Sequence, residues 1–479
     1  MGSNIVIPEK NNSHQEAAMA AQQAIWIPDI RPFSHLPTYL GLVEAIAAAI
    51  RCGELKAGDR LPPQRRLAWA MDLNPSTTLQ AYREASRRHL ISGEVGRGTY
   101  VLADSQEASL FRLRTATVAA TELIDLTTNV PILPLEGHDM RDTLHHLADD
   151  ADAHSGWANY LTDADALQGE LLCAQWMREV RQMEVPPDQF MLCPGAQKGL
   201  LAVLMSFCHG GDPVLVEALT APGIRSGCRQ LRLPLHDIRM DSEGILPEEL
   251  DRMARSTGAR VALLTPILQN PTGTTMTVQR QHAIAEVVAH HDLQVIEDDV
   301  YGGLSDVPPL TRLLGHRGIL VSSLSKTVAP GLRFGFIHAQ PERLAQIDPD
   351  TQLTRWGMSP LMLGVARHWI EHGIAQRHLR HQRQATAQRW QLAQRLLGHA
   401  MLMGTQPSPH IWVHNVGHLP QLAQACEARG VKVTPENVFA IHPHTEQAVR
   451  ISLSAAPDME TLEKALRLIA PLFAPPTAS

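Results

Sequence analysis

Residues 323–333 are Ser323-Leu324-Ser325-Lys326-Thr327-Val328-Ala329-Pro330-Gly331-Leu332-Arg333. This run follows Ile319 to Val321, an apolar stretch typical of a buried strand, so we expect Lys326 where that strand ends. A lysine near serines is by itself an ordinary loop feature. The hydroxyls of Ser323 and Ser325 together with Arg333 make the run a candidate anion site, because a fixed cation beside hydroxyl donors suits a dianion.

Apolar runs and helical stretches alternate on both sides of this motif. The other apolar runs are Pro213 to Val216, Val261 to Leu264 and Gln294 to Ile296, and one of the helical stretches is Gln281 to His290. This alternation predicts an α/β fold with a mostly parallel sheet covered by helices on both faces. After Arg355 the chain becomes more helical before a strand-like run near residue 450, which indicates a small C-terminal subdomain.

Three acids follow one of these apolar runs, in Val295-Ile296-Glu297-Asp298-Asp299-Val300-Tyr301. Open α/β sheets bind ligands at the carboxyl ends of their strands, where these acids are expected. Strand alternation places Asp298 on the face opposite its two neighbours, so we favour Asp298 as the ligand-binding acid. Glu297 and Asp299 are the competing candidates, and one of them can instead cap the following segment.

Three further motifs accompany the lysine and the acids. Pro194-Gly195-Ala196-Gln197 precedes an apolar helix, whose free N–H groups can bind a phosphate. Gln269-Asn270-Pro271-Thr272-Gly273 is by itself typical of a turn. Arg450, in the run Val449 to Leu453, can grip a carboxylate in a bidentate fork, or it can be a surface strand arginine.

Taken in the order in which they occur along the chain, the five motifs resemble those of the fold-type I aminotransferases, which use pyridoxal 5'-phosphate (PLP). PLP chemistry needs a lysine that bonds the cofactor's aldehyde, an acid that keeps the pyridine nitrogen protonated, and a phosphate cup. The resemblance assigns the bonding lysine to Lys326 and the acid to Asp298. It further implies ring-oxygen contacts from Tyr301 and Asn270, a carboxylate contact from Arg450, and phosphate contacts from Arg333, Ser323, Ser325, Gly195, Ala196 and Gln197.

One position departs from that family. Where relatives carry an aromatic residue that stacks on the pyridine, this chain has Leu219-Thr220-Ala221-Pro222-Gly223. Ala221 cannot stack, and losing an aromatic face costs about 1 kcal/mol of ring affinity. We therefore expect looser cofactor binding and inefficient turnover.

The part of the chain before this domain has a different pattern. Tyr39, Val43, Ile46 and Ile50 recur at helical spacing, which predicts a first helix. The prolines of Leu61-Pro62-Pro63 suit the start of a short second helix containing Leu67, Ala68 and Met71. We expect Asn74 to cap a third helix that begins at Pro75 and turns Leu79 and Tyr82 inward. Residues 90–101 contain two short β-like runs around glycines, which predicts a hairpin.

This segment resembles the GntR family of winged-helix repressors. The similar runs are Leu61 to Ala68, Ser76-Thr77-Thr78 with Ala81-Tyr82, and Gly96 to Val101. Nine cations and six anions give residues 36–102 a net charge of +3, whereas the whole chain carries −7. We expect this domain to bind double-stranded promoter DNA. The predicted DNA contacts are Arg65, Arg66, Ser76, Thr77, Thr78 and Arg97.

Length and composition fit more than one globular domain, since 479 residues exceed a usual single core. We predict an extension at 1–35, a winged helix-turn-helix domain at 36–102, a linker at 103–122 and a PLP-binding domain at 123–479. Six dispersed cysteines without a CxxC pair indicate neither a disulfide framework nor a zinc site, and a reducing cytoplasm fits them. The 24 histidines show no metal-binding spacing, so no metal is expected and we interpret them as mostly surface residues.

The fused arrangement resembles the MocR subfamily of GntR regulators, which is dimeric and PLP-dependent. The resemblance implies a cytoplasmic, homodimeric transcription regulator that responds to PLP or to an amine or amino-acid effector. The alternative is a PLP-dependent aminotransferase acting on an amino acid, because Lys326, Asp298 and Arg450 are all present. Ala221 argues against efficient turnover, so we expect transamination to be residual or secondary.

Overall fold

The computed structural model describes residues 26–34, 36–51, 54–55, 59–87, 90–94, 98–101, 123–132, 138–149, 156–157, 159–347, 353–401, 403–417, 419, 422–441 and 448–474. It divides into two compact units, Met1–Thr115 and Ala116–Ser479. The predicted linker and Arg97 lie outside the described residues. Within the described residues, no helix has the length and apolar character needed to cross a membrane.

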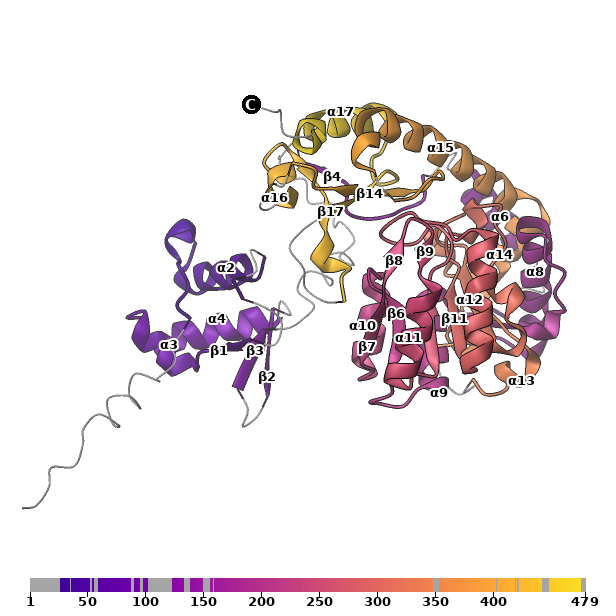
Figure 1. Ribbon diagram of the computed structural model, residues 1–479, viewed down its shortest axis with the longest axis horizontal. Helices are drawn as coiled ribbons and strands as arrows, with labels where there is room; N and C mark the ends of the chain where they lie inside the picture. Colours follow the sequence, from indigo (N-terminus) through magenta and orange to yellow (C-terminus); the bar gives the residue numbers. More distant parts are fainter. Residues whose placement is uncertain are drawn as a thin grey trace, which may run out of the picture. The chain divides into compact units, whose positions relative to one another are not determined.

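The described residues of the first unit form α-helices and a small antiparallel sheet (Figure 1). The helices are α2 (Thr38–Arg51), α3 (Gln64–Ala70) and α4 (Pro75–Arg87). Strands β2 (Ile91–Glu94) and β3 (Gly98–Val101) form the expected antiparallel hairpin. The sheet also contains β1 (Arg60–Leu61), which pairs antiparallel with β3 and was not predicted from the sequence. This arrangement confirms the predicted winged helix-turn-helix.

Local interactions set the third helix of this unit. The Asn74 side chain accepts a hydrogen bond from the Ser76 backbone N–H at 2.9 Å, so Asn74 caps α4 as predicted. Tyr82 is buried, and its hydroxyl donates to the Pro62 carbonyl at 2.7 Å. The prediction that Leu79 turns inward is wrong, because Leu79 is 37% exposed. Ala81 and Ala85 pack on the core from the same helix as Tyr82.

The second unit is built on a seven-stranded sheet of order β5-β13-β12-β11-β10-β6-β7. Only β13 runs antiparallel to its neighbours, so the sheet is mostly parallel, as predicted. The strands are β5 (Phe190–Cys193), β6 (Val214–Glu217), β7 (Leu235–Ile238), β10 (Val261–Leu264), β11 (Gln294–Asp298), β12 (Gly318–Ser323) and β13 (Gly335–His338). A short hairpin of β8 (Met240–Asp241) and β9 (Gly244–Ile245) follows β7.

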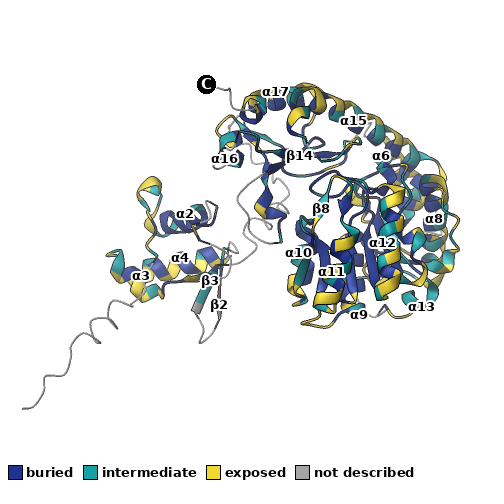
Figure 2. Cartoon of the chain, in the orientation of Figure 1, coloured by how far each residue is buried: buried dark blue, intermediate teal, exposed yellow. Residues whose placement is uncertain are grey.

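Helices cover both faces of this sheet, and all of its strands except the edge strand β7 are largely buried between them (Figure 2). Val214 and Val216 lie in one apolar cluster, whereas Leu215 between them lies in another, as strand alternation requires. Helices α9 (Ala196–Phe207) and α10 (Pro222–Gln230) contribute to the first cluster. Helices α11 (Pro247–Thr257) and α12 (Val278–His291) contribute to the second.

The remaining elements complete a third cluster and a small subdomain. The third cluster includes residues from α8 (Asp163–Arg181), α14 (Pro360–Glu371) and the start of α15 (Ile374–Leu397), and α6 (His138–Asp149) packs beside it. The subdomain sheet has the order β14-β17-β16. The strands of this sheet are β14 (His410–His414), β16 (Thr434–Pro435) and β17 (Ala448–Ser452). The subdomain also contains the parallel pair β4 (Ile124–Asp125) and β15 (Val431–Lys432) and the helices α16 (Leu422–Glu427) and α17 (Met459–Ile469). The short helix α13 (Pro341–Leu344) lies outside this subdomain.

The core of the winged helix-turn-helix provides a test of this fold. Leu67 is fully buried, so Leu67→Ala should lower the free energy of unfolding of this unit by about 2–5 kcal/mol. Leu79→Ala, at a partly exposed position of the same unit, should cost under about 1 kcal/mol. Hydrogen exchange of the α4 amides measures both. Equal effects of the two substitutions would contradict the assigned core.

Candidate PLP site and DNA-binding face

The carboxyl ends of the central parallel strands gather the predicted site residues. Lys326 follows β12 and is half-buried, and its Nζ donates a hydrogen bond to the Asn129 carbonyl at 2.7 Å. Burial, together with the charges of Arg450 and Arg333, lowers the pKa of Lys326 to about 8, while the charge of Asp298 acts in the opposite direction. An amine with this pKa is far more often neutral near pH 7 than an exposed lysine, as a nucleophile requires.

The three acids at the end of β11 have separate environments. Glu297 accepts hydrogen bonds from the backbone N–H groups of Leu310 and Thr311 at 3.1 and 2.7 Å, so it caps the following turn. Asp299 forms a buried ion pair with Arg181 at 3.2 Å. Both competing acids, Glu297 and Asp299, therefore already have partners within the protein.

Asp298 has far less help from the protein. It is buried, and a long 3.4 Å hydrogen bond from the Val300 backbone N–H reaches its carboxylate. Burial raises the pKa of Asp298 to about 7, and the charge of Lys326 opposes that shift. A buried carboxylate with so weak a partner fits a ligand that supplies a protonated nitrogen, as the pyridine of PLP does.

Tyr301, Asn270 and Arg450 form the other side of the site. Tyr301 is buried, and its hydroxyl accepts a hydrogen bond from Asn129 Nδ2 at 2.8 Å, which leaves the Tyr301 hydrogen available for a ligand oxygen. Asn270 Oδ1 accepts from Arg450 Nη1 at 2.8 Å, which leaves the Asn270 amide hydrogens available. Arg450 is buried over the Phe439 ring, and burial lowers its pKa to about 10, so it stays cationic at neutral pH.

The residues predicted for the phosphate meet at the start of α9. Gly195 has φ +93°, and a Cβ added there would lie 2.6 Å from the Arg333 guanidinium. Arg333 Nη2 donates to the Pro194 carbonyl at 2.8 Å, which ties this cation to the helix start. Ala196 and Gln197 supply the first amides of α9, and free N–H groups at a helix N-terminus can bind an anion.

The other residues predicted to bind the phosphate lie at the end of β12 and at the start of α9. Ser323 is buried at the end of β12, and Ser325 is half-buried two residues later, with its N–H 3.4 Å from Ser323 Oγ. The Gln197 side chain turns away to donate to the Gly223 carbonyl at 2.9 Å, so only its backbone N–H is available to a phosphate. Ala221, at the N-cap of α10, is half-buried beside an apolar cluster.

Two residues of the site were missed by sequence reasoning. Asn129 Nδ2 contacts His410 Nδ1 at 2.9 Å as well as Tyr301, and His410 Nε2 contacts the Gln269 carbonyl at 2.9 Å. Burial, together with the charge of Arg450, lowers the pKa of His410 to about 3, so the ring is neutral. Its Nδ1 therefore accepts and its Nε2 donates. Neither residue lies in a recognisable motif, and His410 is one of 24 histidines.

The described residues that we predict to contact DNA lie on α3 and the start of α4. Arg65, Arg66 and Ser76 are exposed there, and Thr77 is half-buried. The prediction for Thr78 is corrected: its side chain is fully buried, and its hydroxyl donates to the carbonyls of Pro75 and Gln64 at 3.1 and 3.3 Å. Thr78 therefore holds α4 to α3 instead of reaching DNA.

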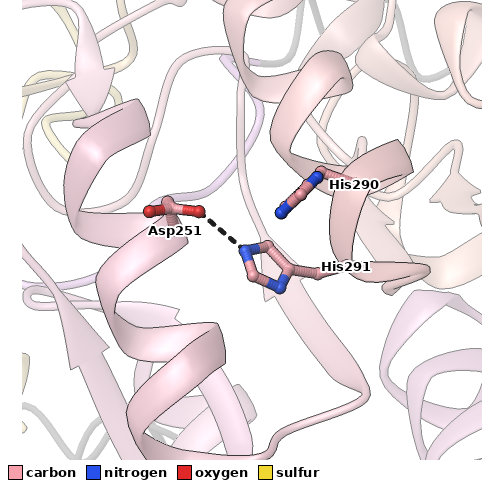
Figure 3. Close-up of side chains that lie close together, drawn as sticks. All are labelled: Asp251, His290 and His291. Atoms are coloured by element: carbon pink, nitrogen blue, oxygen red, sulfur yellow. Dashed lines mark hydrogen bonds and ion pairs between the residues drawn. The ribbon is translucent and has the colours of Figure 1, made fainter.

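One histidine pair noted in the sequence lies in a polar cluster (Figure 3). His291 Nε2 lies 2.7 Å from Asp251 Oδ1, and His290 stands beside them at the end of α12. Asp251 also pairs with Arg255 at 2.9 Å, one turn along α11. These contacts explain the cluster as a polar network in which the hydrogen bond between His291 and Asp251 links α12 to α11.

Comparison with known proteins agrees with the division of the chain into two family domains. The family model for class I and II aminotransferases matches residues 121–469, and that for bacterial regulatory proteins of the gntR family matches residues 38–101. The chain is 26% identical to the uncharacterized HTH-type transcriptional regulator YdeF of Bacillus subtilis, over 93% of this chain and 96% of that protein. It is 27% identical to the vitamin B6 salvage pathway transcriptional repressor PtsJ of Salmonella typhimurium, over 69% of this chain and 71% of that protein.

Solved structures show the same fold for the large unit. The multiple substrate aminotransferase of Thermococcus profundus superposes with a TM-score of 0.65 at 22% identity, over 77% of this chain and 94% of that one. An archaeal alanine:glyoxylate aminotransferase gives a TM-score of 0.67 at 20% identity, over 82% of this chain and 98% of that one. The family match makes PLP the cofactor of this domain.

The lowered pKa of Lys326 predicts how PLP attachment depends on pH. Since the neutral amine reacts, the attachment rate should rise with pH and level off above about pH 8, not above the ordinary lysine value of 10.5. Asp298→Asn should move this midpoint lower, because it removes the anion that favours the ammonium form. Stopped-flow absorbance of added PLP measures the rate. A wild-type midpoint near 10.5 would contradict the buried position of Lys326.

The phosphate cradle gives a second prediction. A Cβ at Gly335 would lie 2.8 Å from the Gly195 Cα, so Gly335→Ala must displace the backbone that turns into α9. Overpacking of this kind costs about 1–3 kcal/mol, and we expect PLP affinity to fall about tenfold or more. Gly331→Ala is the matched control, because its added Cβ meets nothing within 4 Å. Unchanged PLP affinity in Gly335→Ala, measured by fluorescence titration, would place the phosphate elsewhere.

A family model matches each of the two units of the chain. The aminotransferase model spans most of the chain, and YdeF, which matches 93% of it, is named as a transcriptional regulator. The chain belongs to the class I and II aminotransferase family through its large unit, which is joined to a gntR-family DNA-binding domain as in the MocR type of transcription regulator.

Proposed function

We propose that this regulator senses PLP, or an amine that reacts with bound PLP, and changes its affinity for promoter DNA in response. The observation that carries the proposal is the reactive environment of Lys326, with its lowered pKa, in a chain that also carries a DNA-binding helix. In this proposal Lys326 bonds the cofactor and Asp298 holds the pyridine nitrogen. Tyr301 and Asn270 contact the ring oxygen.

The remaining site residues hold the two anionic groups. Arg333, Ser323, Ser325 and the amides of 195–197 bind the phosphate, and Arg450 binds the carboxylate of an amino-acid effector. Arg450 suits this role because its Nε is buried without a hydrogen-bond partner among the described residues, while its other nitrogens hold Asn270 and Thr127. A buried guanidinium with an unused donor favours an anionic ligand.

PLP itself is the signal that we favour. Ala221 offers no aromatic face to the pyridine, which weakens ring affinity by about 1 kcal/mol and brings binding closer to free cellular levels. PtsJ is named as a transcriptional repressor of the vitamin B6 salvage pathway, which supports the same signal. Micromolar or weaker PLP binding is expected, and very tight binding would count against PLP as the signal.

The proposed active form is a cytoplasmic homodimer that presents two winged helices to DNA. Tyr160 and Trp356 support it: they are 71% and 50% exposed, and their rings lie 5.5 Å apart. Exposed aromatic side chains that contact each other are typical of protein interfaces.

The test is DNA binding with and without PLP. We expect PLP to change the Kd of the protein for DNA upstream of its own gene by at least about fivefold, the lower range of allosteric coupling. Lys326→Ala should abolish the response, whereas Lys464→Ala, at an exposed position of α17, should retain it. If no PLP or amine alters the Kd, the sensor proposal fails. Efficient conversion of PLP to its amino form by an amino acid would favour the aminotransferase alternative.

A further inference from the structure

The segment from 123 to 132 is placed to report on ligands in the PLP site. In sequence it directly follows residues 102–122, which connect it to the DNA-binding unit. It enters the small subdomain through β4, where the N–H groups of Ile124 and Leu126 donate to the carbonyls of Gly430 and Lys432 at 2.8 and 2.9 Å. Beyond β4 the chain runs into the site itself.

Four consecutive carbonyls of this segment accept hydrogen bonds from the surroundings of the site. Leu126 accepts from the Ser452 N–H at 2.9 Å, and Thr128 accepts from the Ser452 hydroxyl at 3.2 Å. Thr127 accepts from Arg450 Nη2, and Asn129 accepts from Lys326 Nζ at 2.7 Å. The main chain of residues 127–129 is therefore held by Arg450 and Lys326, the two side chains that we propose to bind the ligand.

The Asn129 side chain adds a third connection. Its Nδ2 donates both hydrogens, one to the Tyr301 hydroxyl and one to His410 Nδ1, and the residue is 6% exposed. Its Oδ1 is buried without a hydrogen-bond partner among the described residues. Asn129 thus bonds to Tyr301 through its side chain and to Lys326 through its main chain.

Ligand binding competes directly with these bonds. When the Lys326 nitrogen bonds the aldehyde carbon of PLP, the aldehyde oxygen leaves as water and the nitrogen keeps at most one hydrogen. That nitrogen no longer has the donors of a free ammonium to offer to the Asn129 carbonyl. A carboxylate that takes Arg450 in a bidentate fork competes in the same way with Thr127 and Asn270.

We propose that Asn129 is a positioning residue that couples the PLP site to the chain leading to the DNA-binding domain. This inference rests on the proposed sensor function and names its transmitting element, the segment 126–129. The residue holds the segment against Tyr301 and His410, so that a change in the bonds of Lys326 or Arg450 shifts the segment as a unit. A ligand alters an equilibrium only through such differential contacts.

The experiment measures the coupling itself. For each variant, the Kd for operator DNA is determined in the absence of PLP and at a PLP concentration shown to saturate that variant, and the ratio gives the coupling. Asn129→Leu should reduce this ratio from its wild-type value to within about twofold of one, against the fivefold or more typical of allosteric coupling. A merely structural defect would weaken DNA binding equally in both conditions and leave the ratio unchanged.

Two further variants keep the result interpretable. Thr128→Val is the matched control, because Thr128 contributes its main-chain oxygen to this network, and it should keep the wild-type ratio. If Asn129→Leu does not fold, Asn129→Asp keeps the shape and removes the donor to Tyr301 and His410. A wild-type ratio in a folded Asn129 variant overturns this inference while the sensor function stands. A ratio of one in the wild type overturns the sensor function itself.

Discussion

The environment of one amine, that of Lys326, defines the candidate site of the large unit. Placing Lys326 among Arg333 and Arg450 disfavours its charged form, and Asp298 only partly offsets this. Such an arrangement persists only when rigid elements hold it, and here the carboxyl ends of β11 and β12 do so. The same residues that make the amine reactive also leave unsatisfied groups around it, which suits a ligand carrying an aldehyde, a protonated nitrogen and a phosphate.

The positions of Lys326, of the acids after β11 and of the start of α4 were predictable from sequence, because the signals that mark them are local. The strand before Lys326, the acids after β11 and the glycine before α9 each combine a burial pattern with a chemical group at its end. Strand alternation separated Asp298 from Glu297 and Asp299, and the structure gives both neighbours partners within the protein. In the DNA-binding unit, Asn74 and Pro75 marked the start of α4.

The wrong predictions and the missed residues have a different physical cause: they depend on tertiary packing. Thr78 lies on the face of α4 that packs against α3, and Leu79 does not, because the rotation of a short helix follows from tertiary packing that local spacing leaves open. Asn129 and His410 reach the site from segments 281 residues apart, and nothing in their flanking sequence marks them. The domain boundaries around residues 103–122 remain a prediction, since those residues lie outside the described part of the chain.

We infer that the bond at Lys326, and not mere occupancy of the site, sets DNA affinity. The most direct measurement compares PLP with pyridoxamine 5'-phosphate, which has the same ring and phosphate but no aldehyde, each at saturation on the wild-type protein. We expect PLP to shift the Kd for operator DNA and the amine form not to reproduce that shift. Equal shifts with the two ligands would contradict it, because the signal would then come from the ring and phosphate alone.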